Sequence, residues 1–466
     1  MSGWISSGRS GPMTVVQRPM SRKEWIDVGE ATRRQVILGA AAAAAAVGVA
    51  ACSPTGGRVE PDAVDEASPL PEVMRNDFRR LTDAQKVRGC SVAAVTREGT
   101  VVADAWGLAR EGLAMTPAST LNIGSVTKTV TATAVLQLVA AGRIDLDADV
   151  NDVLAHSRVY GPRSVRSPYH PDVPITVRHL IAHLTPIDSP IEPGPYGYSY
   201  RVGPVADPAE MGRWLHDFLT PTPRGWTYSR DNFTKAVPGQ SHLYSDIAYD
   251  LAGHVVQAVT GQFFADYCRD AILRPAGMTR SDFNRDRLAE SNRAHPHAWF
   301  DNGVKRGMWP DYRNLIPHDI PDDFTGHVEY APYTSCLLAD GGLRSNAFDL
   351  ARWVRMWLGQ GTIDGTEVLE KRWAVAALSD QVSPNILAAS DAPLPMISQG
   401  FAWHRVDGDA EGVWQHAGSE FGTASYVMLD TKRGVGAAVV CNTELALEAD
   451  PRATMLHQLM DVAARG

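Results

Sequence analysis

A serine and a lysine three residues apart give the clearest chemical signal in the sequence. Ser125-Val126-Thr127-Lys128 is the only S-x-x-K in a chain that has seven lysines among its 466 residues. It opens a predicted helix, on which residues i and i+3 share one face. The lysine amine can therefore hydrogen-bond the hydroxyl and take its proton. The helix N-terminus adds N–H groups and a positive partial charge, which stabilise a developing anion.

The helix that positions this pair is predicted from its apolar spacing and its stop signal, which involve Val130, Ala134, Leu138, Ala141 and Gly142. To act as a base at neutral pH, Lys128 would need a lowered pKa, through burial or a neighbouring cation. The alternative is a serine that caps the helix, followed by a lysine that faces solvent. The S-x-x-K alone does not decide between the two.

Further segments follow the S-x-x-K in a fixed order. They are AGRIDLD at 141–147, ITVRHLIAH at 175–183, HLYSDIAYDLAG at 242–253, ILRPAGM at 272–278, GGLRS at 341–345, GFAW at 400–403 and HAG at 416–418. The ordered set closely resembles the serine β-lactamase and penicillin-binding-protein superfamily, in its class C-like branch with esterases and D-amino-acid peptidases. The resemblance covers most of residues 72–466.

The resemblance implies a role for each matching residue. Ser125 would be the acylated nucleophile and Lys128 its partner base. Tyr244, which opens Tyr-Ser-Asp, matches the family tyrosine that shuttles protons. The backbone N–H groups of Ser125 and Ser419 would form the oxyanion hole. Tyr312-Arg313-Asn314 spells the family's Y-x-N literally, but no apolar helix follows it, so Tyr244 is preferred.

Two positions depart from the family pattern. The third motif, His416 to Gly418, has histidine where β-lactam-recognising members usually have lysine. A neutral imidazole is a poorer partner for a substrate carboxylate. Asp246 stands where the family usually has asparagine, and an ionised carboxylate accepts hydrogen bonds but cannot donate one to a substrate amide. Asp246 would also favour a charged Lys128. Both departures argue against efficient hydrolysis of penicillins or peptidoglycan stems.

Other conspicuous side chains are predicted to be structural. His179 and His183 have metal-type spacing, but no H-E-x-x-H accompanies them. His295 and His297 are expected in a loop. The tyrosines at 196, 198 and 200 could line an acyl pocket or pack an insertion. We expect no metal and no cofactor.

The predicted fold is α/β (α+β), with one antiparallel sheet built from both chain ends and flanked by helices. Strand patterns fall at 91–96, 100–107, 400–406, 413–416, 424–429 and 435–441, and a last helix covers about 450–464. Residues 72–150 and 336–466 would form this α/β part. Residues 151–335 would form an inserted helical, loop-rich part, and 280–335 looks irregular.

The first 51 residues are predicted to be a twin-arginine lipoprotein signal peptide. Arg33 and Arg34 precede an Ala-rich stretch that is shorter than the ~20 apolar residues a membrane span needs. The stretch ends in Val-Ala-Ala-Cys, so Cys52 would carry a lipid that anchors the protein to a membrane. Residues 52–71 would be a tether.

The remaining cysteines (Cys90, Cys268, Cys336 and Cys441) fit no zinc spacing, and buried free thiols are expected although export permits pairing. The chain has 53 acidic and 44 basic residues, which argues against nucleic-acid binding. Three functions stay open. The first is an exported carboxylesterase working through an acyl-enzyme. The second is a D-amino-acid peptidase or β-lactamase. The third is a sensor or binding protein without turnover. A small ester or amide would be the substrate, and oligomeric state is left open.

Overall fold

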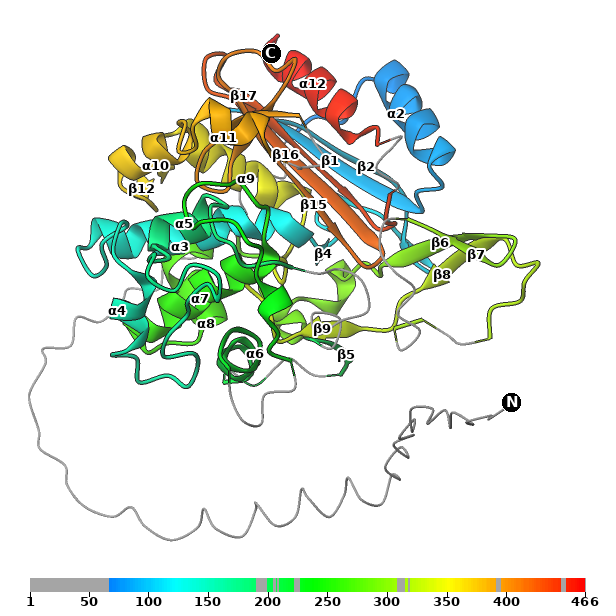
Figure 1. The fold of residues 1–466 in the computed structure, drawn as a ribbon. Helices are drawn as coiled ribbons and strands as arrows, with labels where there is room; N and C mark the ends of the chain where they lie inside the picture. The colour runs from blue at the N-terminus through cyan, green and yellow to red at the C-terminus, as the bar shows by residue number, and fades with distance from the viewer. Residues whose placement is uncertain are drawn as a thin grey trace, which may run out of the picture. The chain divides into compact units, whose positions relative to one another are not determined.

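Strands from the two ends of the chain form one eight-stranded sheet, in the order β13-β14-β15-β16-β17-β1-β2-β3. At its centre β1 (Gly89–Thr96) pairs antiparallel with β17 (Val435–Cys441), and β2 (Thr100–Arg110) lies on the other side of β1. The strands β15 (Val413–Glu420) and β16 (Thr423–Asp430) form a hairpin beside β17. The antiparallel sheet built from both ends is therefore confirmed (Figure 1).

This computed structural model describes residues 67–189, 199–203, 207, 209–221, 227–307, 315–316, 319–390, 395–445 and 450–465. All of them belong to one unit, Pro61–Gly466. The predicted signal peptide, Cys52 and most of the tether lie outside the described residues, as do Tyr196, Tyr198 and Tyr312. Within the described ranges, no helix has the length and apolar character to cross a membrane.

Helices cover both faces of the sheet, which is why its central strands are apolar throughout. On β1, Cys90, Val92 and Ala94 belong to the core under α2 (Glu72–Ala84) and α12 (Arg452–Ala463). The alternate residues Ala93 and Val95 belong to the larger core that contains α9 (Ala347–Leu358). Side chains on a strand point alternately to its two faces, so a strand buried on both needs a continuous apolar run.

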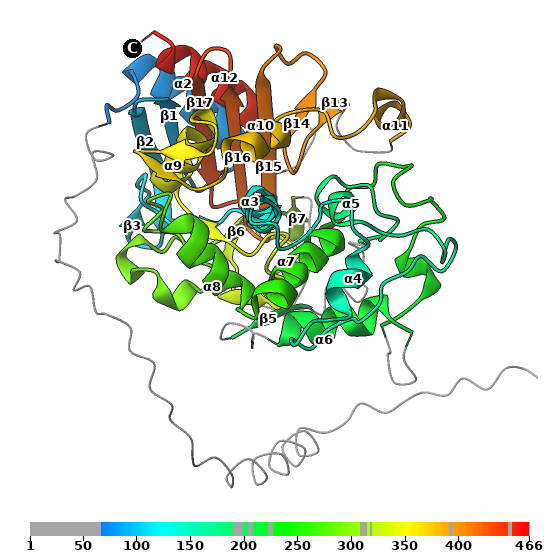
Figure 2. The ribbon, with the colours of Figure 1, turned by 90° about the vertical axis from the view of Figure 1, so that its left-hand side faces the viewer.

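The second part of the fold is built around α3 (Thr127–Ala140), which packs on α7 (Asp246–Thr260). Figure 2 shows α3 between the sheet and α7. The other helices here are α4 (Val150–Leu154), α5 (Val177–Ile181), α6 (Glu210–Leu219) and α8 (Phe264–Cys268), which continues as the π-helix η5 (Arg269–Leu273). Eleven of the fourteen residues of α3 are buried. Packing on all sides therefore fixes the position of the side chains at the start of this helix.

The remaining elements are short. They are β3 (Leu113–Ala114), β4 (Leu121–Asn122), β5 (Tyr200–Val202), β6 (His297–Asp301), β7 (Val304–Arg306), β8 (Gly326–Glu329), β9 (Tyr333–Ser335), β10 (Arg344–Ser345), β11 (Thr362–Ile363), β12 (Thr366–Glu367), β13 (Met396–Gln399), β14 (His404–Val406), α10 (Lys371–Ala377), α11 (Pro384–Ala388), and the 3-10 turns η2 (Gly124–Val126), η4 (Arg230–Asn232), η6 (Arg285–Arg287) and η7 (Glu290–Asn292).

Two local predictions were wrong. The described parts of residues 280–335 are not irregular, because β6, β7 and β8 form a three-stranded sheet whose first turn is Asn302-Gly303, both with positive φ. An Asn-Gly pair is a strong hairpin signal. Residues 400–406 are not one strand. The Gly400 N–H donates to the Trp403 carbonyl at 2.7 Å, and Ala402 has φ +65°, so a turn separates β13 from β14.

The four cysteines in the described ranges are buried free thiols, as expected. Cys90 and Cys441 face each other across β1 and β17 with their sulfurs 3.4 Å apart. Burial raises the pKa of the Cys90 thiol well above its usual range, which keeps it protonated and unreactive.

Candidate active site

The turn that carries Ser125 is pressed against β15. Gly124 has φ +49°, and a Cβ on it would lie 2.7 Å from the Ser419 nitrogen, so only glycine fits there. The Gly124 N–H donates to the Asn122 side-chain oxygen at 2.7 Å, and the Ser425 hydroxyl donates to the Ile123 carbonyl at 2.6 Å. These contacts place Ser125, at the start of α3, beside the backbone of Ser419.

Lys128 lies one helical turn after Ser125 and is completely buried. Its Nζ is 2.9 Å from the Ser125 Oγ, 2.8 Å from the Asp340 carbonyl oxygen and 2.6 Å from Asp246 Oδ1. The amine donates hydrogen bonds to the Ser125 and Asp340 oxygens and forms an ion pair with Asp246. The alternative of a solvent-facing lysine is therefore wrong, and Ser125 accepts a hydrogen bond from a charged amine.

The charge state of Lys128 follows from two opposing effects. Burial lowers the pKa of its amine, but the charges of Asp246, Tyr244 and Asp340 raise it, and the net pKa lies above the usual lysine value. The expectation that Asp246 faces Lys128 and keeps it charged agrees with this geometry. The resting amine is thus an acid that must first lose a proton before it can act as a base.

Tyr244 completes the cluster around Ser125. The Lys128 Nζ is 5.1 Å from the centroid of its ring, and the His183 ring stacks on the tyrosine ring with centroids 4.3 Å apart. Its neighbour Ser245 caps α7 by accepting the Ala248 N–H at 3.0 Å. Burial raises the pKa of the Tyr244 hydroxyl, an effect that the charge of Lys128 and hydrogen bonding to Ser125 partly oppose.

The third motif supplies a neutral ring instead of a cation. His416 is 2% exposed, its Nδ1 lies 2.7 Å from the Ala417 carbonyl, and its ring centroid is 6.5 Å from that of Tyr244. Burial, with the nearby His404 and Lys128, holds the pKa of His416 well below the ordinary histidine value. Gly418 leaves no room for a side chain against the Ile123 carbonyl. At neutral pH the imidazole of His416 therefore carries no charge.

A sequence model of the β-lactamase family matches residues 74–460. The chain belongs to this family. The penicillin-binding protein 4 of Amycolatopsis lactamdurans is 27% identical to it over 338 residues, which are 72% of this chain and 75% of that protein. The D-alanyl-D-alanine-carboxypeptidase/endopeptidase AmpH of Escherichia coli K12 is 22% identical over 327 residues, 69% of this chain and 70% of AmpH.

A lovastatin esterase of Penicillium rubens is 28% identical over 246 residues, 48% of this chain and 58% of that enzyme. The octameric penicillin-binding protein homologue from Pyrococcus abyssi has the same fold, with a TM-score of 0.62 at 21% identity over 84% of this chain and 77% of that one. The predicted family and fold are confirmed. Carboxypeptidases and esterases among the relatives support a serine hydrolase.

Within this β-lactamase-family fold, two residues that support the site were not predicted. Asp250 is fully buried one turn after Asp246 on α7, and its Oδ1 accepts the N–H groups of Ala339 at 3.0 Å and Asp340 at 3.3 Å. It thereby fixes the segment whose carbonyl binds Lys128. Asp250 follows Asp246 by four residues, and this spacing in the sequence indicates that both lie on one face of the helix. The contact made by the Asp340 carbonyl has no such signal in the sequence.

The histidines with metal-type spacing have structural roles, as expected. His179 and Thr176 form a capping box at the start of α5. His183 accepts the Ser245 N–H on its Nδ1 at 3.1 Å. Within the described ranges, no group of three or more His, Cys, Asp or Glu side chains is placed to hold a metal ion.

Glu420 is a buried acid behind the Ser125 turn. Its Oε2 accepts the Tyr200 hydroxyl at 3.1 Å, and its Oε1 accepts the Phe421 N–H at 3.1 Å. Burial, with the nearby charge of Asp340, raises its pKa to about 8. Of the three tyrosines in question, Tyr200 therefore packs the fold here, and Glu420 is protonated at neutral pH.

Glu420→Gln is expected to reduce the loss of stability with rising pH. Unfolded Glu420 ionises above about 4.5, whereas the folded residue stays protonated to about 8. The free energy of unfolding therefore falls over this window and levels off above it, by at most about 5 kcal/mol. Glutamine does not titrate, and it can accept the Phe421 N–H on its oxygen while its amide N–H donates to the Tyr200 oxygen. Urea unfolding at pH 5 and pH 8.5 should show a smaller difference for the variant. Equal differences would show that Glu420 ionises normally.

Proposed function

We propose that the protein is an exported serine hydrolase that cleaves carboxylic esters through an acyl-enzyme on Ser125. The 2.9 Å contact between Lys128 Nζ and Ser125 Oγ carries this proposal. The site lacks the positive third-motif side chain that would bind a substrate carboxylate, since His416 is neutral and buried.

The reaction would run in two halves. After the Lys128–Tyr244 pair has lost one proton, it accepts the Ser125 hydroxyl proton as Oγ attacks the ester carbonyl. The oxyanion forms beside the backbone N–H groups of Ser125 and Ser419, whose close approach Gly124 permits. Collapse breaks the C–O bond, and the same proton passes to the departing alkoxide. Water then repeats these steps to release the acid and restore Ser125.

Esters suit this site better than amides. An ester carbonyl is more electrophilic than an amide carbonyl, so Ser125 can attack it with less help from a base that is held charged by Asp246. Asp246 also offers no N–H to an amide-bearing substrate. The lovastatin esterase among the relatives is consistent with an ester substrate.

The test is a panel of p-nitrophenyl esters, run beside a chromogenic cephalosporin and a D-alanyl-D-alanine peptide. Fluorophosphonate labelling reports on the nucleophile. We expect labelling and a kcat/KM for the best ester at least about tenfold above the other two substrates. A faster cephalosporin or peptide would instead support the β-lactamase or D-amino-acid peptidase alternative, which the relation to AmpH favours. Stoichiometric acylation without turnover would support the sensor alternative, which the Asp246–Lys128 pair favours.

Export is tested through the leader. Replacing Arg33 and Arg34 with Lys is expected to leave full-length precursor in the cytoplasm, because the signal requires the arginine pair. Cys52→Ser is expected to release mature protein from the membrane fraction, because the lipid would be lost. Immunoblots of cell fractions measure both, with Arg22→Lys as the matched control. Membrane-bound protein in both variants would show that the leader is a plain anchor.

A further inference from the structure

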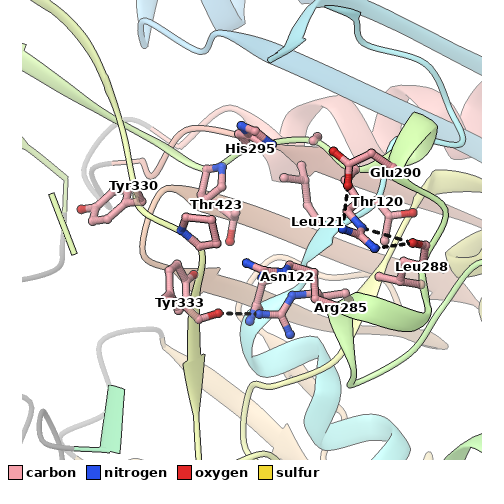
Figure 3. A pocket seen from close by; sticks show the side chains of 15 residues that line it. Thr120, Leu121, Asn122, Arg285, Leu288, Glu290, His295, Tyr330, Tyr333 and Thr423 are labelled. Atoms are coloured by element: carbon pink, nitrogen blue, oxygen red, sulfur yellow. Dashed lines mark hydrogen bonds and ion pairs between the residues drawn. The ribbon is translucent and has the colours of Figure 1, made fainter. Parts of the chain in front are cut away.

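A pocket of about 290 Å³ lies beside β4 and β10 (Figure 3). Three arginines line it, namely Arg285, Arg293 and Arg344, together with a single carboxylate, Glu290. The whole chain carries a formal charge of −9, so a pocket with three guanidinium groups and one carboxylate is opposite in sign to the protein.

The one carboxylate in the lining is already shared. Glu290 binds Arg293 at 2.6 Å through one oxygen and Arg110 at 2.6 Å through the other. The nearest acid to Arg285 is Asp286, at 3.6 Å from its Nε. The acidic neighbours of Arg293 and Arg285 are therefore known, and Arg344 is the third arginine of the lining.

Arg344 has no ion pair among the described residues. It donates to three backbone carbonyls, those of Phe283 at 3.1 Å, Tyr333 at 3.0 Å and Gly342 at 3.4 Å. Carbonyls accept its hydrogen bonds but do not neutralise its charge. Burial lowers the pKa of Arg344 from its ordinary value, which shows that the cation is poorly solvated. An anion in the pocket would compensate this charge.

Away from the arginines, the wall of the pocket is largely apolar, with Leu121, Leu288, Pro296 and Pro332. The lining therefore suits a small molecule with a hydrocarbon part and an anionic end.

The pocket lies near the turn that carries the nucleophile. Asn122, Tyr333 and Arg344 also line a smaller adjoining cavity, which reaches Gly341 and Glu420. A Cβ on Gly341 would lie 3.7 Å from Gly124. Asn122 precedes Ser125 by three residues, so their Cα atoms are at most about 11 Å apart.

We propose that this pocket binds the carboxylate of a small organic acid, with Arg285 and Arg344 as its cationic partners. Guanidinium groups bind carboxylates through paired N–H···O bonds. The carboxylate can belong to the acyl arm of the substrate or to a free acid that binds separately. The acyl-arm version rests on the proposed ester hydrolysis, whereas binding of a free acid does not.

Free binding is tested with glutarate on the full chain carrying Ser125→Ala, by isothermal titration calorimetry. Dimethyl glutarate is the uncharged control ligand. We expect glutarate alone to bind, with an affinity that falls about tenfold in Arg285→Gln. Arg287→Gln removes the same charge outside the pocket, where the arginine pairs with Asp266 at 2.9 Å, and it should leave binding unchanged. Arg344→Lys keeps the positive charge but loses the paired N–H donors of the guanidinium group, and the folded variant should bind glutarate more weakly.

The acyl arm is tested by comparing the p-nitrophenyl monoester of glutaric acid with p-nitrophenyl butyrate. A lower KM for the acidic ester, which disappears in Arg285→Gln, would assign the pocket to the substrate. Calorimetric binding without this preference would assign it to a free acid. Absence of both would overturn the proposal. If no ester is turned over but glutarate still binds, the proposed function fails while the pocket assignment stands.

Discussion

Ser125→Ala is expected to abolish fluorophosphonate labelling and to lower ester kcat/KM by at least about 10³-fold, because no other group can form the acyl-enzyme. The fold should persist. Ser125 accepts a hydrogen bond from Lys128, and that amine keeps its contacts with Asp246 and the Asp340 carbonyl. Intact-mass spectrometry after labelling, with a thermal melt of the same sample, measures both outcomes.

A matched control for this variant is Ser379→Ala. Ser379 donates to the Ala376 carbonyl at 2.8 Å near α10, away from the Ser125 cluster. The Ser379→Ala variant should be labelled by the fluorophosphonate and should turn over esters like the unmodified protein. Labelling that persists in Ser125→Ala would overturn the nucleophile assignment, and loss of labelling in Ser379→Ala would show that the effect is not specific to Ser125.

Asp246→Asn is expected to move the rising limb of the pH–rate profile to lower pH. In the native site the Asp246 carboxylate lies 2.6 Å from Lys128 Nζ and helps to hold its pKa above the usual value. Without that charge, burial of Lys128 dominates and its pKa falls. The amine then loses its proton at lower pH, so kcat reaches its plateau earlier. The new amide donor should also raise cephalosporin turnover relative to esters.

The same substitution has a cost in stability. A raised Lys128 pKa means that the ion pair stabilises the fold below pH 10.5 and that this contribution is lost as pH rises through the folded pKa. Removing one partner of a buried pair costs about 3–5 kcal/mol when the other stays charged. Asp246→Asn should therefore have a lower melting temperature at pH 7. Its free energy of unfolding should fall by less than the ~3–5 kcal/mol range for a buried pair, because Lys128 can become neutral.

Asp250→Asn is the control for this prediction. Burial and the nearby Asp340 raise the pKa of Asp250 well above its ordinary range, and its Oδ1 accepts the Ala339 and Asp340 N–H groups instead of contacting Lys128. The rising limb of the pH–rate profile of Asp250→Asn should lie at the same pH as in the unmodified protein. If the limb of Asp246→Asn is also unshifted, Lys128 is not the group whose titration controls the rate.

The pair at the centre of the site was predictable because helix geometry is local. Ser125 and Lys128 are three residues apart, so forming α3 is enough to bring them together. The contact of Lys128 with Asp246 spans far more chain, and it was foreseen through the family pattern around Tyr244. The Asp340 carbonyl could not be foreseen, since every residue has a carbonyl and only tertiary packing selects this one.

The sheet was predicted well where burial on both faces leaves a continuous apolar run, as in β17. Prediction failed where one residue interrupts the pattern, as at Ala402 between β13 and β14. The pocket lined by arginines could not be predicted from the sequence, for a different reason. Arg285, Arg293 and Arg344 come from separate segments, and β4 and β10 must pair before they meet.

The pairing of β1 with β17 has a consequence for biosynthesis. The ribosome completes β1 and Ser125 hundreds of residues before it makes β17, the strand that pairs with the free edge of β1. At ~10 residues per second the nascent chain carries that open edge for roughly half a minute. The Ser425 hydroxyl that holds the Ile123 carbonyl arrives just as late. The turn that carries the reactive serine is therefore held in place only after β16 has been made, and a protein cut short before β16 would leave the ribosome without a working nucleophile.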